Sequence, residues 1–475
     1  MYRSWAQYAL LLVLCLTTRS LTSIYYIEDV DSLRFAFAAT DFSVADFRPH
    51  FPGYPVYCFL LQGVYLLTAS VGLSFALLGG LSTFLLITAA DRIWGLWSQR
   101  PSYLLSGLLI LNPLLWLMST RYMPDIMGLA LLLWACYWML SAFATRQLLP
   151  ALLFCGAVGL LAGVRLSYLP FFLPALALVP LFLRQLHFLA GVILLAVAVW
   201  LIPLILDTGF EALLRAGQNQ TTGHFYEWGG AVTSESATYR YRLMRTLESL
   251  WADGMGAWWT NRHWLTGLLA GVWLLAMGSG LRQLWTTKKW QDRRVQLLLI
   301  GTGSYLIWAF FFQNIIYKPR HIMPLLPFLV LLCTLGFFHF QQWNTKAALG
   351  LMVVGVALNL LVTGILVNQH RSPSAIAQLA SYIHEQPASD RIIHTDRLRY
   401  FYLNSHVKLQ GTPFIVGNDS TQLHEVYQQG KVLYSTERID HWLQMAPVEE
   451  QTFFHNPYVN RLWSQVKVYK YAKNG

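Results

Sequence analysis

The chain has 475 residues, of which 55% are hydrophobic and only 12% are charged, and its formal net charge is +11. Soluble domains average about 25% charged residues, so this composition, with a mean hydropathy of +0.43, excludes an ordinary soluble protein. The positive charge favours contact with anionic lipid and anionic substrate groups, whereas no basic patch interleaved with aromatic residues supports binding to nucleic acid.

Long apolar runs approach the about 20 residues that a spanning helix needs, which predicts an all-α polytopic membrane protein. Residues 5–25 form the first expected span, because Arg19 stands where a signal peptide would need a small residue for cleavage. Residues 56–70 are apolar but interrupted by Gln62 and Gly63, and we interpret them as a re-entrant or interfacial helix. The later spans, which bring the total to about 11, are expected at residues 71–90, 102–120, 126–144, 148–164, 168–184, 187–206, 263–281, 295–313, 322–340 and 347–367.

With eleven spans, the basic loops all fall on one face of the membrane. These loops contain Arg3, Arg92, Arg146, Arg184, Lys346 and the cluster of residues 282–294. The positive-inside rule makes that face cytoplasmic, so we expect the N-terminus inside and the C-terminus outside. The outer face then receives a first loop at 26–57, a long loop at 207–262 and everything after residue 368.

The composition changes sharply at the end of the last expected span. Apparent helices alternate there with short strands, a pattern typical of a small α/β domain. We therefore divide the chain into a membrane module, residues 1–370, and an extracytoplasmic α/β domain, residues 371–475. In this domain the helices are expected at 374–386 and 420–429, and the strands at 391–395, 407–410, 431–435 and 465–471.

The first outer loop concentrates acidic residues in a chain that is otherwise poor in charge. It contains Asp29 and Asp31 and closes with a rigid aromatic turn, Pro49-His50-Phe51-Pro52-Gly53-Tyr54-Pro55. The low-dielectric edge of a bilayer can raise the pKa of a carboxyl group, which would suit Asp31 to act as a general base. An aspartate also caps helices often, here a helix over Ser32–Ala39, and the residues alone leave both roles open. His50 either orients a substrate or makes a local hydrogen bond within the turn.

Three further groups of charges are expected on the same outer face. Arg121 and Asp125 flank a short turn, where they either pair with the helix dipole or supply a second carboxylate that faces Asp31. Arg165 follows an uninterrupted apolar span, and Lys318, Arg320 and His321 form the cluster Lys-Pro-Arg-His-Ile-Met-Pro. These cations either snorkel to lipid headgroups or form a phosphate clamp, for which the planar fork of arginine is suited.

Taken in order, these motifs resemble the GT-C superfamily of integral-membrane glycosyltransferases. The family uses polyprenyl-phosphate sugars and includes protein O-mannosyltransferases and lipid A aminoarabinose transferases. The resemblance rests on the acidic loop, Pro-His-x-Pro-Gly-Tyr-Pro, Arg-x-x-Pro-Asp and Arg-His-x-x-Pro-x-x-Pro, over about residues 5–370. It implies an essential aspartate a few residues before an aromatic-Ala pair, which Asp31 before Phe35-Ala36 fits better than Asp29. Ser32 stands where the family often has an acidic residue, and this leaves the choice between Asp29 and Asp31 open.

The resemblance implies an inverting glycosyltransferase at the outer face of a bacterial inner membrane. The donor would be a sugar on a polyprenyl phosphate, and the acceptor a hydroxyl on a lipid, glycan or protein. Asp31 would be the base, with Asp29 as the alternative, and Asp125 the second carboxylate. The cations would bind the donor phosphate: Arg320, His321, Arg165 and Lys318. His50, Tyr54 and Arg121 would shape the acceptor site or its loop.

Two other functions remain open from the sequence. A transporter or flippase for an anionic lipid-linked substrate would also need outward-facing charges, although it predicts charges deep in spans or a matching pair of broken helices. A non-catalytic partner in envelope polysaccharide assembly would use the C-terminal domain for binding. No cofactor is certain, and no metal site has recognisable ligand spacing, so dependence on a divalent metal stays undecided.

Overall fold

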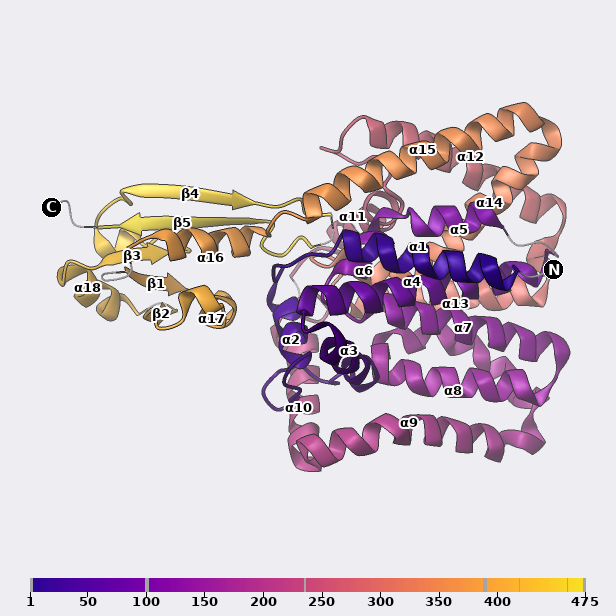
Figure 1. Ribbon diagram of the computed structural model, residues 1–475, viewed down its shortest axis with the longest axis horizontal. Helices are drawn as coiled ribbons and strands as arrows, with labels where there is room; N and C mark the ends of the chain where they lie inside the picture. Colours follow the sequence, from indigo (N-terminus) through magenta and orange to yellow (C-terminus); the bar gives the residue numbers. More distant parts are fainter. Residues whose placement is uncertain are drawn as a thin grey trace.

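The computed structural model describes residues 3–98, 102–234, 236–387, 391–417, 419–458 and 460–472. A bundle of long helices forms the larger part, and a small sheet with its own helices extends from one end of it (Figure 1). The N-terminus lies at the opposite end of the bundle from this sheet (Figure 1). The fold is therefore mostly helical with a small C-terminal sheet, as the sequence predicts.

The helices of the bundle follow the apolar runs of the sequence. Because there is no water to hydrogen-bond the backbone inside a bilayer, a spanning segment must satisfy its own polar groups, and a helix does so. The bundle contains α1 (Trp5–Leu21), α4 (Val71–Gly95), α5 (Tyr103–Ile110), α6 (Pro113–Thr120), α7 (Asp125–Thr145), α8 (Leu148–Arg165), η1 (Leu166–Leu181), α9 (Leu186–Thr208), α12 (Leu265–Thr286), α13 (Arg293–Phe312), η6 (Pro319–Leu325), α14 (Leu326–Trp343) and α15 (Thr345–His370).

By length and composition, eight helices in the described residues can cross a membrane, or nine if the bent pair α5 and α6 counts as one span. The predicted eleven differ from this number for two reasons. They include α1, which has only 17 residues, and they count α8 and η1 as two spans, whereas the number above takes Leu148–Leu181 as one. The backbone leaves helical geometry at Arg165 (φ −154°, ψ 77°), so α8 and η1 are separate elements, as the predicted division at 148–164 and 168–184 expects. Residues 56–70, interpreted as re-entrant or interfacial, form α3 (Pro55–Thr68), which at 14 residues is short for a span.

The segment predicted as a helix over 168–184 is a 3₁₀ helix, η1, and contains Pro170, Pro174 and Pro180. Proline lacks a backbone N–H and clashes with the preceding turn of an α-helix, so three prolines disfavour regular α-helix here. The backbone leaves helical geometry at Phe172, so η1 is two short helical pieces joined at a kink rather than one straight 3₁₀ helix, and runs of 3₁₀ helix are indeed short as a rule. The element still packs in the bundle, against α13 and α7.

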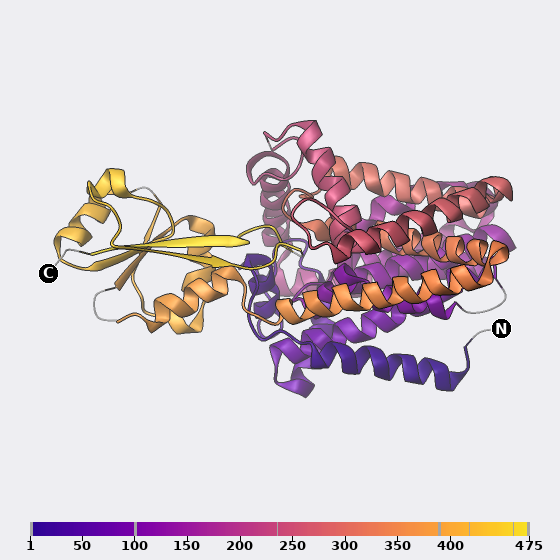
Figure 2. The same cartoon turned by 90° about the horizontal axis from the view of Figure 1, so that it is seen from above.

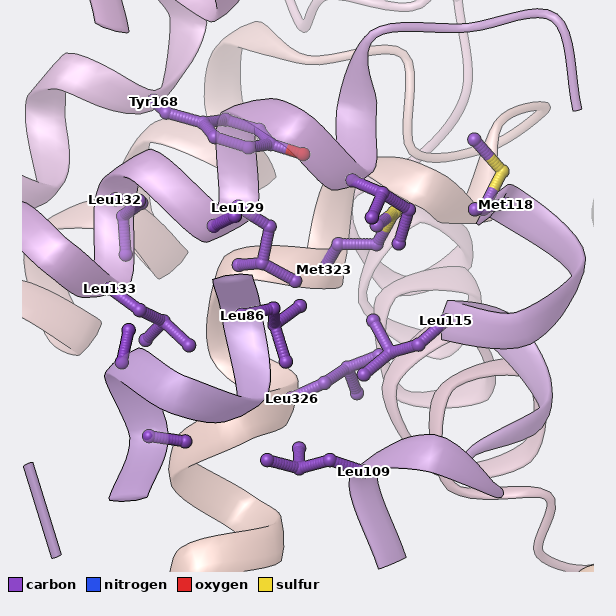
Figure 3. Packing of buried hydrophobic residues seen from close by; sticks show 14 of the residues in the cluster. Leu86, Leu109, Leu115, Met118, Leu129, Leu132, Leu133, Tyr168, Met323 and Leu326 are labelled. Carbon is purple, nitrogen blue, oxygen red and sulfur yellow. The ribbon is translucent and has the colours of Figure 1, made fainter. Parts of the chain in front are cut away.

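Apolar side chains fill the centre of the bundle. Leu129 of α7, Leu326 of α14 and Leu115 of α6 are buried in one cluster, together with Met323 of η6 (Figure 3). Small residues let helix backbones approach closely where these layers meet. A Cβ on Gly79 would lie 1.7 Å from the carbonyl oxygen of Ser119, so only glycine permits the contact between α4 and α6.

The C-terminal sheet has the strand order β2-β1-β3-β5-β4. Strands β2, β1 and β3 are parallel, and β5 and β4 add an antiparallel edge. The predicted strand at 407–410 is wrong: residues Val407–Leu409 form a 3₁₀ turn, η7, with the ring of His406 accepting from the backbone N–H of Lys408. The elements are α16 (Ala375–Glu385), β1 (Arg391–Thr395), α17 (Arg397–Asn404), β2 (Phe414–Val416), α18 (Ser420–Gln428), β3 (Val432–Ser435), α19 (Asp440–Leu443), β4 (Glu449–Phe454) and β5 (Gln465–Tyr471).

Short elements lie between the bundle and the sheet, at the end of the bundle where α2 (Val30–Ala38) is drawn (Figure 1). Helix α2 belongs to both hydrophobic cores: Phe35 is buried in the core of the bundle, and Leu33 is buried in the core of the C-terminal domain. The long loop at residues 207–262 contributes α10 (Phe210–Thr222), α11 (Tyr239–Glu248) and a π-helical turn, η4 (Ser249–Gly254).

Candidate active site

Helix α2 presents the carboxylate of Asp31 from its first turn. The helix begins two residues earlier than predicted, and its cap is Asp29, whose side chain accepts a 2.9 Å hydrogen bond from the backbone N–H of Ser32. The predicted alternative, Asp31 as the cap of a helix over Ser32–Ala39, is therefore wrong. The capping geometry leaves the Asp31 side chain free to make contacts outside its own helix.

Three cations surround Asp31. Its Oδ2 accepts a 2.8 Å hydrogen bond from Nη2 of Arg320 and is also ion-paired with the ammonium group of Lys318. On the other side, Nη1 of Arg34 lies 3.8 Å from Oδ1. The structure thus brings the acidic loop together with a cluster almost 290 residues later in the chain.

These cations control the ionisation of Asp31. Burial alone would raise the pKa of this carboxyl group, but the charges of Lys318 and then Arg320 outweigh burial and hold the pKa well below its ordinary value. Burial lowers the pKa of Lys318, and the Asp31 carboxylate opposes that shift. Asp31 is therefore an ionised carboxylate whose basicity is reduced by its partners.

Asp125, at the start of α7, is the second carboxylate of the cluster. Its Oδ1 lies 2.9 Å from Nη2 of Arg165 and 3.9 Å from Nε of Arg320. Because Arg320 contacts both Asp31 and Asp125, one guanidinium group connects the two carboxylates. All of these side chains are at least nine-tenths buried.

Several buried polar atoms around the two carboxylates have no hydrogen-bond partner among the described residues. Nε and Nη1 of Arg320, Nε of Arg165 and Nε of Arg34 are donors of this kind. Buried polar groups are normally hydrogen-bonded, so a concentration of unsatisfied donors indicates a site for a polar ligand. These donors are cationic and therefore suited to an anionic group, while both carboxylate oxygens of Asp125 also make no hydrogen bond among the described residues and are suited to a donor such as a hydroxyl.

Asp29 and Arg121 take part in a neighbouring network instead. Arg121 is ion-paired with Asp29 and, at 3.3 Å, with Glu28. The amide of Asn460 donates a 3.0 Å hydrogen bond to Asp29, and His370 lies 3.1 Å from Glu28. Burial would raise the pKa of Glu28, but Arg121 outweighs it and lowers the pKa to about 2. Asp29 thus pairs with the backbone N–H of Ser32, with Arg121 and with the amide of Asn460. None of these groups contacts the carboxylate of Asp31.

The aromatic turn borders the Asp125–Arg165 pair. His50 Nε2 lies 3.0 Å from the hydroxyl of Tyr54, and Nη1 of Arg165 donates to that hydroxyl at 3.5 Å. Burial lowers the pKa of His50 to about 3, so its imidazole is neutral. His321 is placed differently from Arg320: its backbone carbonyl accepts a 2.8 Å hydrogen bond from Tyr305.

An apolar cavity of about 1590 Å³ lies between α12, α13, α14 and α5. At one end it reaches Leu325, in the same short helix as Arg320. At the other end it reaches residues near the N-terminus and the basic loop after α12. Its lining includes Ser4, Lys289, Leu298, Leu325, Phe328 and Phe338.

The donor set does not favour a metal ion at this site. Asp31 and Asp125 each face cations, which would repel a metal. In the described ranges no group of three or more His, Cys, Asp or Glu side chains could hold a metal ion.

Arg34 is the residue of this cluster that the sequence did not single out. One turn after Asp31 on a short helix, it reads as an ordinary solvated charge. Its position relative to Asp31 could have been a signal, because residues three apart on a helix face the same side.

No family model and no curated protein matches the sequence. Solved structures do match it. ArnT from Cupriavidus metallidurans bound to undecaprenyl phosphate is 13% identical, with a TM-score of 0.57 and coverage of 98% of this chain and 98% of that chain. The same protein in the apo state is 13% identical, with a TM-score of 0.56 and coverage of 97% of both chains. The chain therefore has an ArnT-like fold over nearly its whole length.

Proposed function

We propose that the protein is a membrane glycosyltransferase that moves a sugar from a polyprenyl phosphate to an acceptor hydroxyl, with inversion. The ArnT-like fold supports an integral-membrane transferase, and undecaprenyl phosphate bound to ArnT supports a polyprenyl-phosphate donor. At 13% sequence identity, the likeness to ArnT supports the fold and the donor class, and the proposal names no particular sugar or acceptor.

One observation carries the proposal: two buried carboxylates and four cations from distant segments converge on a single site that contains unsatisfied donors. Arg320, between Asp31 and Asp125, offers Nε and Nη1 to an anion. A sugar phosphate needs this combination, because the reaction requires a base and develops negative charge on the leaving phosphate.

In the proposed reaction Asp31 accepts the proton of the acceptor hydroxyl. The hydroxyl oxygen forms a bond to the anomeric carbon as the bond from that carbon to the phosphate oxygen breaks, and the electron pair leaves with the phosphate. Arg320, Arg165 and Lys318 stabilise the charge that develops there. When the phosphate engages Lys318 and Arg320, these cations hold Asp31 less tightly, so its pKa rises and it becomes a better base.

The other residues have supporting roles in this proposal. Asp125 orients Arg165 and Arg320 toward the phosphate. His50 and Tyr54 form the wall next to Arg165. His321 directly follows Arg320, and its backbone carbonyl accepts a hydrogen bond from Tyr305. Asp29 and Arg121 fix the start of α2 and so position Asp31, rather than act on the substrate.

The apolar cavity supports lateral entry of the donor from the bilayer, since its end at Leu325 adjoins the clamp segment. We place the protein in a bacterial inner membrane with the N-terminus cytoplasmic and the C-terminal domain periplasmic. The transporter alternative expects matching broken helices. The described residues contain one bent pair, α5 and α6, and the charges gather at one end of the bundle, so transport ranks second.

The test is release of undecaprenyl phosphate from a panel of undecaprenyl-phosphate-linked sugars by purified protein supplied with envelope lipids. Wild-type protein should release it, and Asp31→Asn should lose at least about 100-fold in turnover, as general-base removal does. Asp41→Asn is the matched control, because Asp41 lies in the same loop with a largely exposed side chain. Near-wild-type turnover by folded Asp31→Asn would reject the assignment of the base. Translocation of the lipid without release would support the transporter.

A further inference from the structure

The connection between β4 and β5 reaches from the C-terminal domain back to the helix bundle (Figures 1 and 2). We propose that Asn460 and Arg461 in this connection are positioning residues: together they hold the acidic loop and the cationic segment of the active site in register. The effect of this alignment on catalysis rests on the function proposed above.

Asn460 acts on the acidic side of the site. Its side chain is only 1% exposed, and Nδ2 donates a 3.0 Å hydrogen bond to Oδ2 of Asp29. The other carboxylate oxygen of Asp29 caps α2 through Ser32. Asn460 therefore fixes the cap of the helix from which Asp31 projects.

Arg461 acts on the cationic side. Its backbone N–H donates a 3.0 Å hydrogen bond to the carbonyl of Tyr317, directly before Lys318. Its Nη1 donates to the carbonyls of Ile315 at 3.2 Å and Ile316 at 3.1 Å. Three successive carbonyls that lead into the clamp are thus held by one residue.

Arg461 is itself anchored to the long outer loop. Its Nη2 is ion-paired with Asp253 of η4, which Arg262 also contacts at 2.6 Å. Nearby, the hydroxyl of Tyr458 donates a 2.7 Å hydrogen bond to the carbonyl of Ala252. The connection is therefore fixed at a third point, independent of the two segments that it aligns.

The C-terminal domain supports the same helix from a second direction. Tyr402 of α17 donates a 2.6 Å hydrogen bond to the carbonyl of Ile27, and Leu33 of α2 is buried in the core of that domain. The ring of Phe401 lies 5.7 Å from the guanidinium carbon of Arg34. Helix α2 cannot shift relative to the C-terminal domain without losing these contacts.

Consecutive residues thus link two segments whose charged groups must meet at one substrate. Catalysis depends on such alignment, since a displacement of about 1 Å can cost about 100-fold in rate. Asn460 and Arg461 do not contact the Asp31 cluster, so their effect should fall on kcat rather than on substrate binding.

The experiment compares Asn460→Ala and Arg461→Lys with wild type in the release assay. Lysine keeps a positive charge opposite Asp253 but cannot reach it and two carbonyls at once, because it lacks the guanidinium fork. We expect kcat to fall about tenfold in each variant, with KM within about twofold, for proteins that purify and melt like wild type. Lys467→Ala is the control, because the ion pair that Lys467 makes in the described part of the chain is with Glu450, inside the β4–β5 hairpin.

Hydrogen exchange supplies a readout that does not need activity. Peptides over residues 26–35 and 313–320 should both exchange faster in each variant, whereas the control should leave them unchanged. If Arg461→Lys has the kcat and the exchange rates of the wild-type protein, Arg461 serves to neutralise Asp253 rather than to align the two segments, and the proposal is overturned. Unchanged kcat and exchange in Asn460→Ala would overturn it equally. If wild-type protein releases no undecaprenyl phosphate, the proposed function fails, while the exchange data still decide the alignment.

Discussion

Two buried ionic networks lie side by side at the end of the bundle next to the C-terminal domain, and they differ in how fully their charges and hydrogen bonds are paired. The Asp29 network sets Asp29 and Glu28 against Arg121 and His370, and Asn460 fills a further hydrogen bond. The Asp31 network sets two carboxylates against four cations, Arg34, Arg165, Lys318 and Arg320. It has an excess of positive charge, and four of its buried donors, together with both carboxylate oxygens of Asp125, make no hydrogen bond among the described residues. Burial is common to both, so we use the excess of positive charge and the unmet hydrogen bonds to distinguish the proposed ligand site from the structural network.

Replacing Arg121 with methionine should produce the largest loss of stability. Both Asp29 and Glu28 would lose a buried guanidinium partner, and breaking a buried pair costs about 3–5 kcal/mol. Thermal unfolding in detergent measures the change. Arg48→Met, which removes a surface pair with Asp41, is the control, and it should cost no more than about 1 kcal/mol. If the two variants melt alike, the Asp29 network is not structural.

Replacing Arg320 with methionine should instead reduce activity. Nε and Nη1 of Arg320 make no hydrogen bond among the described residues, and removal of one preorganised donor to a developing anion costs about 100–1000-fold in kcat. The release assay measures this, alongside the melting temperature. We expect a smaller change in melting temperature than for Arg121→Met, because Lys318 and Arg165 still neutralise the two carboxylates. If Arg320→Met loses more stability than Arg121→Met while keeping its activity, the Asp31 network is structural and the comparison is wrong.

Replacing Lys318 with methionine should change the pH dependence. Lys318 is the largest favourable influence on the Asp31 carboxylate, and it lowers the pKa of that group. Removing this cation raises the pKa, so Asp31 loses its charge at a higher pH. The acidic limb of the kcat/KM profile should therefore move to higher pH, whereas Lys467→Ala should leave it in place. A limb that does not move would show that Asp31 is not the titrating base.

The sequence is informative where the signal is local. Apolar runs predict most helices, and the prolines in η1 could have predicted its irregular geometry. The motifs around Asp31, Asp125 and Arg320 also stand out locally, and the fold brings these residues together. The choice of helix cap could not be predicted, because Asp29 and Asp31 are both suitable caps and tertiary partners decide between them.

Contacts between distant segments could not be predicted at all. Nothing local to Asn460 or Arg461 indicates that they contact Asp29 and the carbonyls before Lys318, since those partners lie far upstream. The predicted strand at 407–410 shows the same limit in the sheet, where pairing partners decide which short apolar run becomes a strand.

Arg34 gives the smallest expected effect and the finest test of the comparison. Its Nη1 faces Asp31 at 3.8 Å, its Nε is unsatisfied, and its side chain is 20% exposed. The rings of Phe47 and Phe401 hold the guanidinium from two sides, and such contacts are worth about 0.5–1 kcal/mol at exposed sites. Arg34→Met should therefore weaken inhibition by added undecaprenyl phosphate about threefold to tenfold, with little change in melting temperature. If inhibition is unchanged while Arg34→Met melts at a lower temperature, Arg34 belongs with the structural network. Its unsatisfied Nε would then be a feature of packing and not evidence for a ligand site.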